Sequence, residues 1–498
     1  MGKYVIGVDN GGTFIKAALF DKNGTQIAIE KEPGVAAVAR NGYVELDQER
    51  LWEVNCECVS RLIKTSGTDP AEIECIGIAG QGKGLYLVGD DGASIRTAIT
   101  SADGRSWEYV ERWKKDGTAD KIFGYTNQGL YTSHPVSILA WMKDHEPENY
   151  EKIRWVFSMK DFLVYRMTGT AVGDYCNQSG GSFINLAAGA YEPEILKLLG
   201  IPEIVDKLPP LMHSAEVCGC VTGEAARRLG CLEGTKVVAG MFDVDASAIA
   251  MGVTGESELC MITGTCSVNA YIAREPVTNH SVLMNSYYCI PGYYFIEEGS
   301  NTSAGVLEWV GDILYPAEKK NGPVYELFNE TVERCKPDRS QAVFLPFLYG
   351  AATDSRSRGV WLGMSPVDTR EDLVRAAYEG VVFSHKWHVD RLMKNRTAPK
   401  AVRMTGGATH SAVWVQMFAD VLQLPVEVVE GQELGVKGAA MAAAIGAGFY
   451  SDFEEAAKAG ITVRKTVYPN PDNREIYEKK YERYLAAAEN LGAVWQLF

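Results

Sequence analysis

Asp9 and Lys16 flank a short run of small residues near the start of the chain. An apolar run ends at Asp9, residues 10–13 read NGGT, and a second apolar run begins at Phe14. Glycine tolerates positive φ and leaves the main chain open, so successive N–H groups can converge on an anion. Phosphoryl transfer also uses a carboxylate for a metal ion and an ammonium for a phosphate. The stretch therefore predicts a phosphate-binding hairpin, with an ordinary β-turn as the alternative.

A second stretch of the same design lies past the middle of the chain. The apolar run 258–263 leads into Gly264 and Thr265, and another apolar run begins at Ser267. Turn chemistry alone explains either stretch taken singly. The pair favours two loops that hold one polyphosphate.

Asp243 is a candidate for the general base of such a reaction. It follows the apolar run 237–242 and precedes a segment typical of a helix. An acid at the end of a strand can accept the proton of a hydroxyl that attacks phosphorus. The alternative is a helix N-cap, a position that Asp favours. Asp245 is a competing acid, which the dipole of a first helical turn would stabilise.

Gln81 and Lys83 alternate with three glycines directly after a buried strand predicted over residues 73–79. The glycines expose the backbone, so the amide and the ammonium could contact a polyhydroxyl ligand; a solvated loop is the alternative. His134, just before Pro135 at a predicted helix start, is a further candidate or a structural residue. His385 and His388 share a helical face without a third ligand nearby, which predicts packing residues.

Gly406 and Gly407 follow the predicted strand 401–405 and lead through Ala408 into a predicted helix over residues 412–422. Such a turn lets a flat ring lie against the main chain. By itself the signal is weak, because many strand-to-helix connections carry two glycines.

Strands and helices alternate along the 498 residues, which predicts an α/β protein. A chain of this length exceeds the size of one core, and glycines interrupt the apolar pattern near residues 252–256, so we expect domains over residues 1–252 and 253–498.

The net charge of -15 argues against nucleic acid or an anionic membrane as a partner. The first residues resemble no secretory signal, and eleven scattered cysteines indicate reduced thiols, so we expect a cytoplasmic protein.

These residues, in this order and spacing from Asp9 to about Gly448, resemble the FGGY family of carbohydrate kinases within the actin-like ATPase superfamily. The resemblance implies an α/β fold of two actin-like (ribonuclease H-like) domains with an interdomain cleft. The sugar and the catalytic base would belong to residues 1–252. ATP would bind residues 253–498, which end in a helical segment.

The resemblance also implies a role for individual residues. Asp243 would be the catalytic base, and Asp9 and Asp243 would hold Mg²⁺. The ATP contacts would be Gly11, Gly12, Thr13, Lys16, Gly264, Thr265, Gly305, Gly407, Ala408 and Ser411. The sugar contacts would be Gln81, Lys83, Asp103, His134 and Asp243. The family usually has W-x-D-x-R around Asp103, and here Ser101 stands in place of the Trp.

Within the family, residues 80–85, 134–137, 242–244, 346–350 and 379–385 are similar to the L-xylulose and 3-keto-L-gulonate kinases. This implies transfer of the γ-phosphoryl group of ATP to a terminal hydroxyl of a ketose, with sugar and ATP as partners and a homodimer as a state to test. Alternatives are a kinase for another pentulose or a tetritol, and an actin-like nucleotide-gated protein without a sugar. No G-x-G-x-x-G follows the first strand, which disfavours a nicotinamide dehydrogenase.

Overall fold

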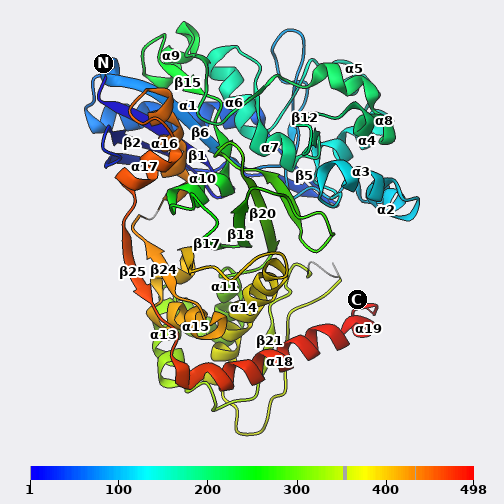
Figure 1. Cartoon of the computed structure of the whole chain (residues 1–498), viewed down its shortest axis with the longest axis vertical. Coiled ribbons are helices and arrows are strands. Elements are labelled where there is room, and N and C mark those ends of the chain that lie inside the picture. The colour runs from blue at the N-terminus through cyan, green and yellow to red at the C-terminus, as the bar shows by residue number, and fades with distance from the viewer. Residues whose placement is uncertain (1, 352–355, 432, 498) are drawn as a thin grey trace. The chain divides into compact units, whose positions relative to one another are not determined.

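The computed structural model describes residues 2–351, 356–431 and 433–497. The chain divides into two compact units (Figure 1). Unit 1 comprises Met1–Thr254, Ile272–Ile296 and Glu433–Ile461, and unit 2 comprises Gly255–Tyr271, Glu297–Gln432 and Thr462–Phe498. Neither unit is one continuous segment, so the single division after residue 252 stays a prediction.

A seven-stranded sheet is the framework of unit 1. Its order is β14-β15-β6-β1-β2-β3, with β16 also paired to β6. The strands are β1 (Tyr4–Asn10), β2 (Phe14–Asp21), β3 (Gln26–Pro33), β6 (Ile73–Gly80), β14 (Val217–Cys220), β15 (Lys236–Val238) and β16 (Met241–Phe242). β1 and β2 form the antiparallel hairpin predicted around residues 10–13, and β1 runs parallel to β6.

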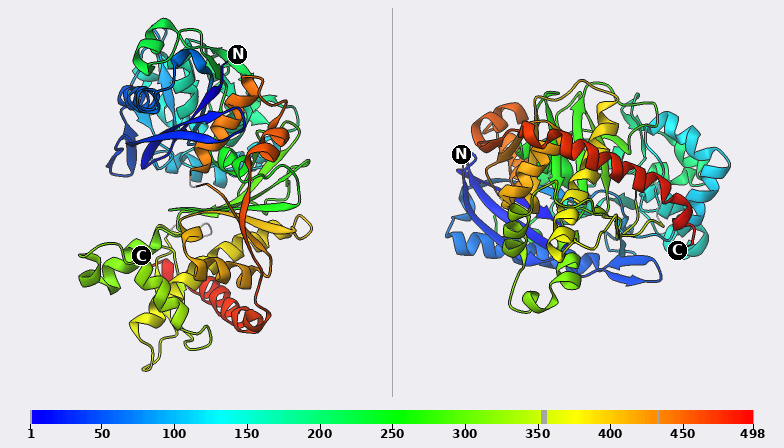
Figure 2. Two further views of the ribbon diagram at one scale, coloured as in Figure 1. Left: turned by 90° about the vertical axis from the view of Figure 1, so that its left-hand side faces the viewer. Right: turned by 90° about the horizontal axis from the view of Figure 1, so that it is seen from below.

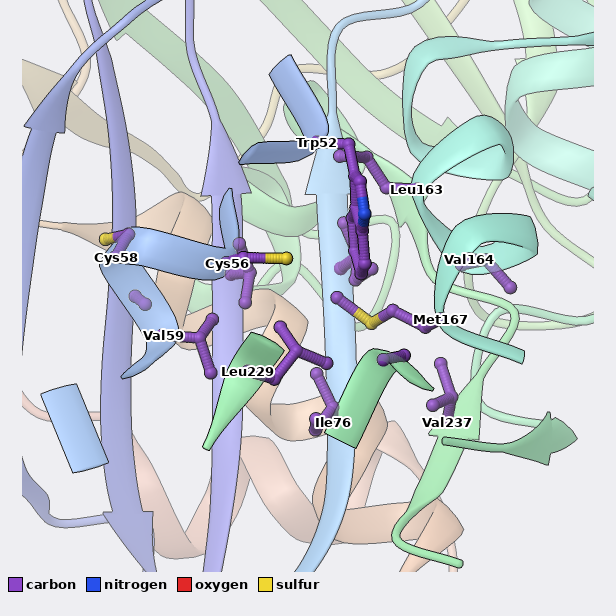
Figure 3. Close-up of a cluster of buried hydrophobic side chains, with 14 of the residues drawn as sticks. Trp52, Cys56, Cys58, Val59, Ile76, Leu163, Val164, Met167, Leu229 and Val237 are labelled. Atoms are coloured by element: carbon purple, nitrogen blue, oxygen red, sulfur yellow. The ribbon is translucent and has the colours of Figure 1, made fainter. Parts of the chain in front are cut away.

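Helices cover both faces of this sheet. The face with Ile6 and Val8 packs on α1 (Gln48–Ser66), α6 (Met159–Thr168) and α9 (Gly223–Leu229). Figure 3 shows this core, with Trp52 and Leu163 from the helices beside strand residues. Successive residues of a strand point to opposite faces, so Gly7 lies on the other side of the sheet. That side carries α16 (Leu434–Gly446), which also packs on α10 (Asp243–Ala250).

Glycines allow α16 to lie very close to the strands, beside β1 and β2 in Figure 2. A Cβ at Gly7 would overlap the carbonyl oxygen of Val436, and one at Gly77 that of Ala439. A Cβ at Gly438 would likewise overlap the carbonyl oxygen of Ala246 in α10. The small-residue run of α16 therefore has a packing role, because larger side chains would push the helix off the sheet.

The other elements of unit 1 are short, and a second apolar core lies among some of them. The strands are β4 (Val38–Arg40), β5 (Tyr43–Leu46), β7 (Tyr86–Val88), β8 (Ala98–Ile99), β9 (Trp155–Phe157), β10 (Gly173–Asp174), β11 (Ile184–Asn185), β12 (Ala190–Tyr191), β13 (Leu211–Met212) and β19 (Met284–Tyr287). The helices are α2 (Trp107–Lys115), α3 (Thr118–Thr126), α4 (Pro135–His145), α5 (Pro147–Glu151), α7 (Tyr175–Gly180), α8 (Pro193–Leu198) and α17 (Phe453–Gly460).

A second seven-stranded sheet has the order β19-β20-β18-β17-β23-β24-β25. Its further strands are β17 (Glu258–Thr263), β18 (Ser267–Ala273), β20 (Tyr294–Ser300), β23 (Ala401–Gly406), β24 (Val426–Val429) and β25 (Val463–Val467). The other elements of unit 2 are β21 (Val343–Leu345), β22 (Val360–Leu362), α11 (Val306–Leu314), α12 (Pro316–Lys319), α13 (Tyr325–Arg334), α14 (Arg370–Met393), α15 (Ala412–Leu422), α18 (Arg474–Asn490) and α19 (Gly492–Trp495).

The strand pairing of the first sheet recurs in the second. β17 is antiparallel to β18, its hairpin partner, and parallel to β23, as β1 is to β2 and β6. The predicted α/β class is confirmed. All eleven cysteines are free thiols. None of the helices in the described part of the chain combines the length and the apolar character of a membrane span.

Candidate active site

The carboxyl ends of β1, β6 and β16 bring predicted site residues of unit 1 together. Asn10 of β1 and Phe242 of β16 both pair with Gly80 of β6. The loops that follow these three residues therefore leave the sheet side by side. A Cβ placed on Gly12 would lie 3.0 Å from Nε2 of Gln81, so these two loops are in contact.

Asp243 is the first residue of α10 and is half-buried. Phe242 occupies the N-cap position and provides no side-chain cap. Asp243 is therefore not the N-cap, the alternative that its sequence left open. Asp245 is fully buried and accepts a hydrogen bond of 3.1 Å from the N–H of Cys289, which ties this second acid into the structure of unit 1.

Asp9 lies near the end of β1, against the first turn of α16. A Cβ on Gly435 would lie only 2.7 Å from Oδ2 of Asp9, so the helix can approach this carboxylate because residue 435 is a glycine. Burial raises the pKa of Asp9 to about 6; Lys16 lowers this pKa and Glu433 raises it further. A bound cation would favour the ionised carboxylate.

Lys16 forms an ion pair with Glu433, a residue that the sequence analysis missed. Lys16 Nζ lies 2.5 Å from Oε2 of Glu433, whose other oxygen pairs with Lys31. Burial works to raise the pKa of Glu433, but the two lysines outweigh it and lower that pKa. Nothing local marks Glu433, because it follows Lys31 by 402 residues.

Lys83 and His134 lie close to each other in unit 1. Lys83 adopts a positive φ of 66°, and its Nζ lies 5.5 Å from the centre of the Tyr131 ring. His134 is fully buried, and its Nδ1 lies 3.0 Å from Oγ of Ser182. Its Nε2 has no hydrogen-bond partner in the described residues. Burial, and then the charge of Lys83, keep the pKa of His134 well below its ordinary value, so the imidazole is neutral.

Both carboxylate oxygens of Asp103 accept hydrogen bonds from neighbouring residues. Its two oxygens accept hydrogen bonds from Nε and Nη2 of Arg105, at 2.8 and 2.9 Å, and Oδ2 also accepts one from the N–H of Val44, at 2.6 Å. Asp103 and Arg105 are both buried, so they form an internal ion pair. Ser101, which stands where the family usually has Trp, donates a hydrogen bond of 3.5 Å from its Oγ to Oε1 of Gln81. A direct contact of Asp103 with a sugar stays a prediction.

Lys160 is a buried cation beneath the same strand ends. Its Nζ pairs with Asp161 and, at 2.6 Å, with Asp174, and it donates a hydrogen bond of 3.0 Å to the carbonyl of Ala239. Attraction to the two carboxylates outweighs burial and raises the pKa of Lys160. Ala239 precedes β16, so this network holds the backbone that leads to Asp243. The sequence analysis did not single out Lys160.

The second hairpin turn is tied to a neighbouring loop of unit 2. The N–H of Ser303 donates a hydrogen bond of 2.9 Å to the carbonyl of Thr265, and the N–H of Gly305 donates one of 3.3 Å to that of Gly264. Thr265 and Gly305 are exposed, so a ligand can reach the backbone here. These three predicted nucleotide residues therefore lie together.

Gly407 and Ala408 follow β23 directly beside this turn. In the register of β17 and β23, Thr263 pairs with Gly406. Gly406 has a φ of 99°, and a Cβ there would overlap the backbone of Thr263, which explains the glycine. A Cβ on Gly407 would meet that of Ala304 at 3.9 Å. The predicted adenosine segment and the second phosphate turn thus share one edge of the sheet.

Buried hydrogen bonds support this loop from behind. Ser303 Oγ lies 2.8 Å from Nε2 of His385, whose Nδ1 lies 2.8 Å from Oδ1 of Asn269. Burial, with a smaller contribution from His388, lowers the pKa of His385 to about 3. His385 is therefore a neutral residue that fixes Ser303. His388 is also structural, since its Nδ1 bonds the carboxylate of Glu298 at 2.8 Å.

Among the described residues, no group of three or more His, Cys, Asp or Glu side chains could hold a metal ion. A Mg²⁺ ion that also binds phosphates needs only one or two protein carboxylates. Asp9 and Asp243 lie at the ends of two strands that both pair with β6, and carboxylate oxygens are the hard ligands that Mg²⁺ prefers.

Comparisons with known proteins agree over nearly the whole chain. Models of the FGGY family of carbohydrate kinases match residues 4–250 (N-terminal domain) and 259–447 (C-terminal domain). The chain is 36% identical to the L-xylulose/3-keto-L-gulonate kinase of Escherichia coli (strain K12), over 97% of this chain and 96% of that protein. It is 35% identical to a probable L-xylulose kinase of Pasteurella multocida, over 97% of each.

Solved structures show the same fold. The xylulose kinase of Rhodospirillum rubrum superposes with a TM-score of 0.90 at 27% identity, over 99% of this chain and 100% of that one. The predicted actin-like, two-domain architecture is thereby confirmed.

Proposed function

The chain belongs to the FGGY family of carbohydrate kinases, and we propose that it phosphorylates a terminal hydroxyl of L-xylulose or 3-keto-L-gulonate. It is a sugar kinase that uses ATP as its co-substrate. The observation that carries the choice of sugar is the 36% identity, over 97% of the chain, with a kinase named for these two substrates.

Asp243 is proposed as the catalytic base. Its carboxylate accepts the proton of the sugar hydroxyl, whose oxygen forms a bond to the γ-phosphorus while the bond to the bridging oxygen of ADP breaks. The half-buried position beside the Gln81 loop supports this role, since the acid is accessible but held by the first turn of α10. The Lys160 network keeps the preceding backbone in place.

Lys16 and the backbone of residues 11–13 are proposed to bind phosphate oxygens of ATP, and Gly264, Thr265 and Gly305 of unit 2 are also proposed to bind phosphate oxygens. Lys16 pairs with Asp9 in the register of β1 and β2 and forms an ion pair with Glu433, so its ammonium lies near the first turn. Asp9 and Asp243 would hold Mg²⁺. This ion would neutralise charge that develops on the transferring phosphoryl group.

Gln81, Lys83 and His134 are proposed to select the sugar. Neutral His134 offers its Nε2 to a hydroxyl, and the ammonium of Lys83 suits a carboxylate such as that of 3-keto-L-gulonate. L-xylulose has no carboxylate, so it would rely on the hydroxyl contacts. Asp103 is proposed to support the site by ordering Arg105 and the backbone at Val44.

The test is ADP release in the presence of L-xylulose, 3-keto-L-gulonate, other pentuloses and tetritols. We expect release with the two named sugars and little with tetritols. Lys83→Met should raise KM for 3-keto-L-gulonate about tenfold or more, because a charge-assisted hydrogen bond is lost, and should change KM for L-xylulose much less. Lys121→Met on α3, which is exposed, is the matched control. An equal effect on both sugars would refute the role of Lys83, and no sugar-dependent release would refute the proposed substrates.

A further inference from the structure

Asn329 of α13 contacts the segment that we propose for adenosine. Its Oδ1 accepts a hydrogen bond of 2.6 Å from Oγ of Ser411 and one of 3.0 Å from the hydroxyl of Tyr378. Ser411 also caps α15, because its Oγ accepts a hydrogen bond of 3.2 Å from the N–H of Trp414. The hydroxyl of Ser411 thus accepts one hydrogen bond, from Trp414, and donates the other, to Asn329.

Both hydroxyls donate to the oxygen of the Asn329 amide. An amide oxygen has two lone pairs, and here both are used. Tyr378 is itself held, since it is buried and its carbonyl accepts a hydrogen bond of 3.2 Å from Nε1 of Trp414. The Nδ2 group of Asn329, on a half-buried side chain, forms no hydrogen bond within the described residues. Asn329 thus presents two N–H donors and no acceptor.

We propose that Asn329 donates a hydrogen bond from Nδ2 to a ring nitrogen of the adenine base and so contributes to nucleotide binding. The inference rests on the proposed placement of adenosine at Gly407, Ala408 and Ser411. Gly407 is exposed and has no side chain to block a flat ring, and Asn329 is bonded directly to Ser411. Because Oδ1 is already used, Asn329 recognises a ring nitrogen rather than the exocyclic amino group, which is a donor.

The first test is Asn329→Asp, which keeps the shape and the acceptors for Ser411 and Tyr378 but removes both N–H donors. ADP binding, measured by calorimetry, should weaken about tenfold or more, since a ring nitrogen loses its partner and a negative charge is added. KM for the sugar and the melting temperature should stay close to those of the parent. Asn490→Asp, the same change at an exposed site on α18, should bind ADP normally.

The second test separates the hydrogen bond from the added charge. The parent protein should bind one of 1-deaza-ADP, 3-deaza-ADP and 7-deaza-ADP about tenfold more weakly than ADP. In Asn329→Asp this difference should vanish, because the charge weakens ADP and that analogue equally. The inference is overturned if the parent binds all three analogues as well as ADP, or if the variant keeps the difference. Both tests measure ADP binding and need no turnover. A parent protein that binds ADP as expected but phosphorylates none of the sugars would overturn the proposed function and leave this inference standing.

Discussion

The two hairpin turns have the same strand pairing, but charged side chains lie only at the first. The first turn, residues 10–13, lies between Asp9 and Lys16, and Lys16 is paired with Glu433. The second turn, residues 264–266, has no charged side chain of its own; its backbone is tied to Ser303, which is supported by neutral His385. Charge is thus gathered at one turn, and neutral hydrogen bonds support the other.

This difference indicates that the two turns have different roles in phosphoryl transfer. Charged groups interact strongly with a group whose charge changes, as in phosphoryl transfer, whereas backbone amides and neutral side chains mainly fix position. We therefore expect charge-removing substitutions near the first turn to affect the reaction more than any change at the second. Three experiments test this order.

Asp243→Asn should have the largest effect. An amide cannot accept the proton, so kcat should fall by about a hundredfold to ten-thousandfold, the usual contribution of a general base. ADP affinity, measured by calorimetry, should change little. Asp90→Asn, with a side chain 92% exposed, is the matched control. Near-normal turnover of the Asp243→Asn variant would remove Asp243 from its role.

Lys16→Met should have the next effect. Loss of a charge-assisted contact should raise KM for ATP about tenfold to a hundredfold. Lys31→Met is the control, because Lys31 pairs with the same Glu433 but lies outside the predicted phosphate contacts. If both variants gave the same KM in initial-rate assays, the contact of Lys16 with Glu433, rather than one with phosphate, would be its main role.

His385→Gln and Ser303→Ala should have the smallest effects. Both remove the neutral hydrogen bond between Ser303 and His385, worth about 0.5–1.5 kcal/mol, and His385→Gln also removes the one to Asn269. KM for ATP should therefore rise about twofold to tenfold while KM for the sugar stays the same. The double variant should be no worse than the poorer single variant, since both substitutions break one contact. Additive effects would mean that His385 does not act through Ser303.

The same pair gives a pH signature. With a pKa of about 3, His385 stays neutral as the pH rises from 6 to 9. The ratio of KM for ATP between His385→Gln and the parent should therefore be constant over this range. An ordinary histidine, with a pKa near 6.5, would lose its proton within the range and change the ratio.

Local chemistry made much of the site predictable. Glycines that expose the main chain, and polar residues directly after apolar strands, mark Gln81, Asp243 and Gly407 in the sequence, and the structure places each at a strand end. Local patterns also have limits. They did not reveal that both oxygens of Asp103 are engaged by Arg105, or that Asp243 is the first helical residue rather than the N-cap.

The sequence by itself determined the α/β class, both hairpins and the strand-end positions of the candidate residues, because backbone freedom and side-chain alternation act over a few neighbouring residues. Only the tertiary structure decided the partners of those residues. Glu433 meets Lys16, Lys160 supports the strand before Asp243, and Asn329 bonds Ser411. Each of these contacts joins segments far apart in the chain, and burial and charge act on them through space.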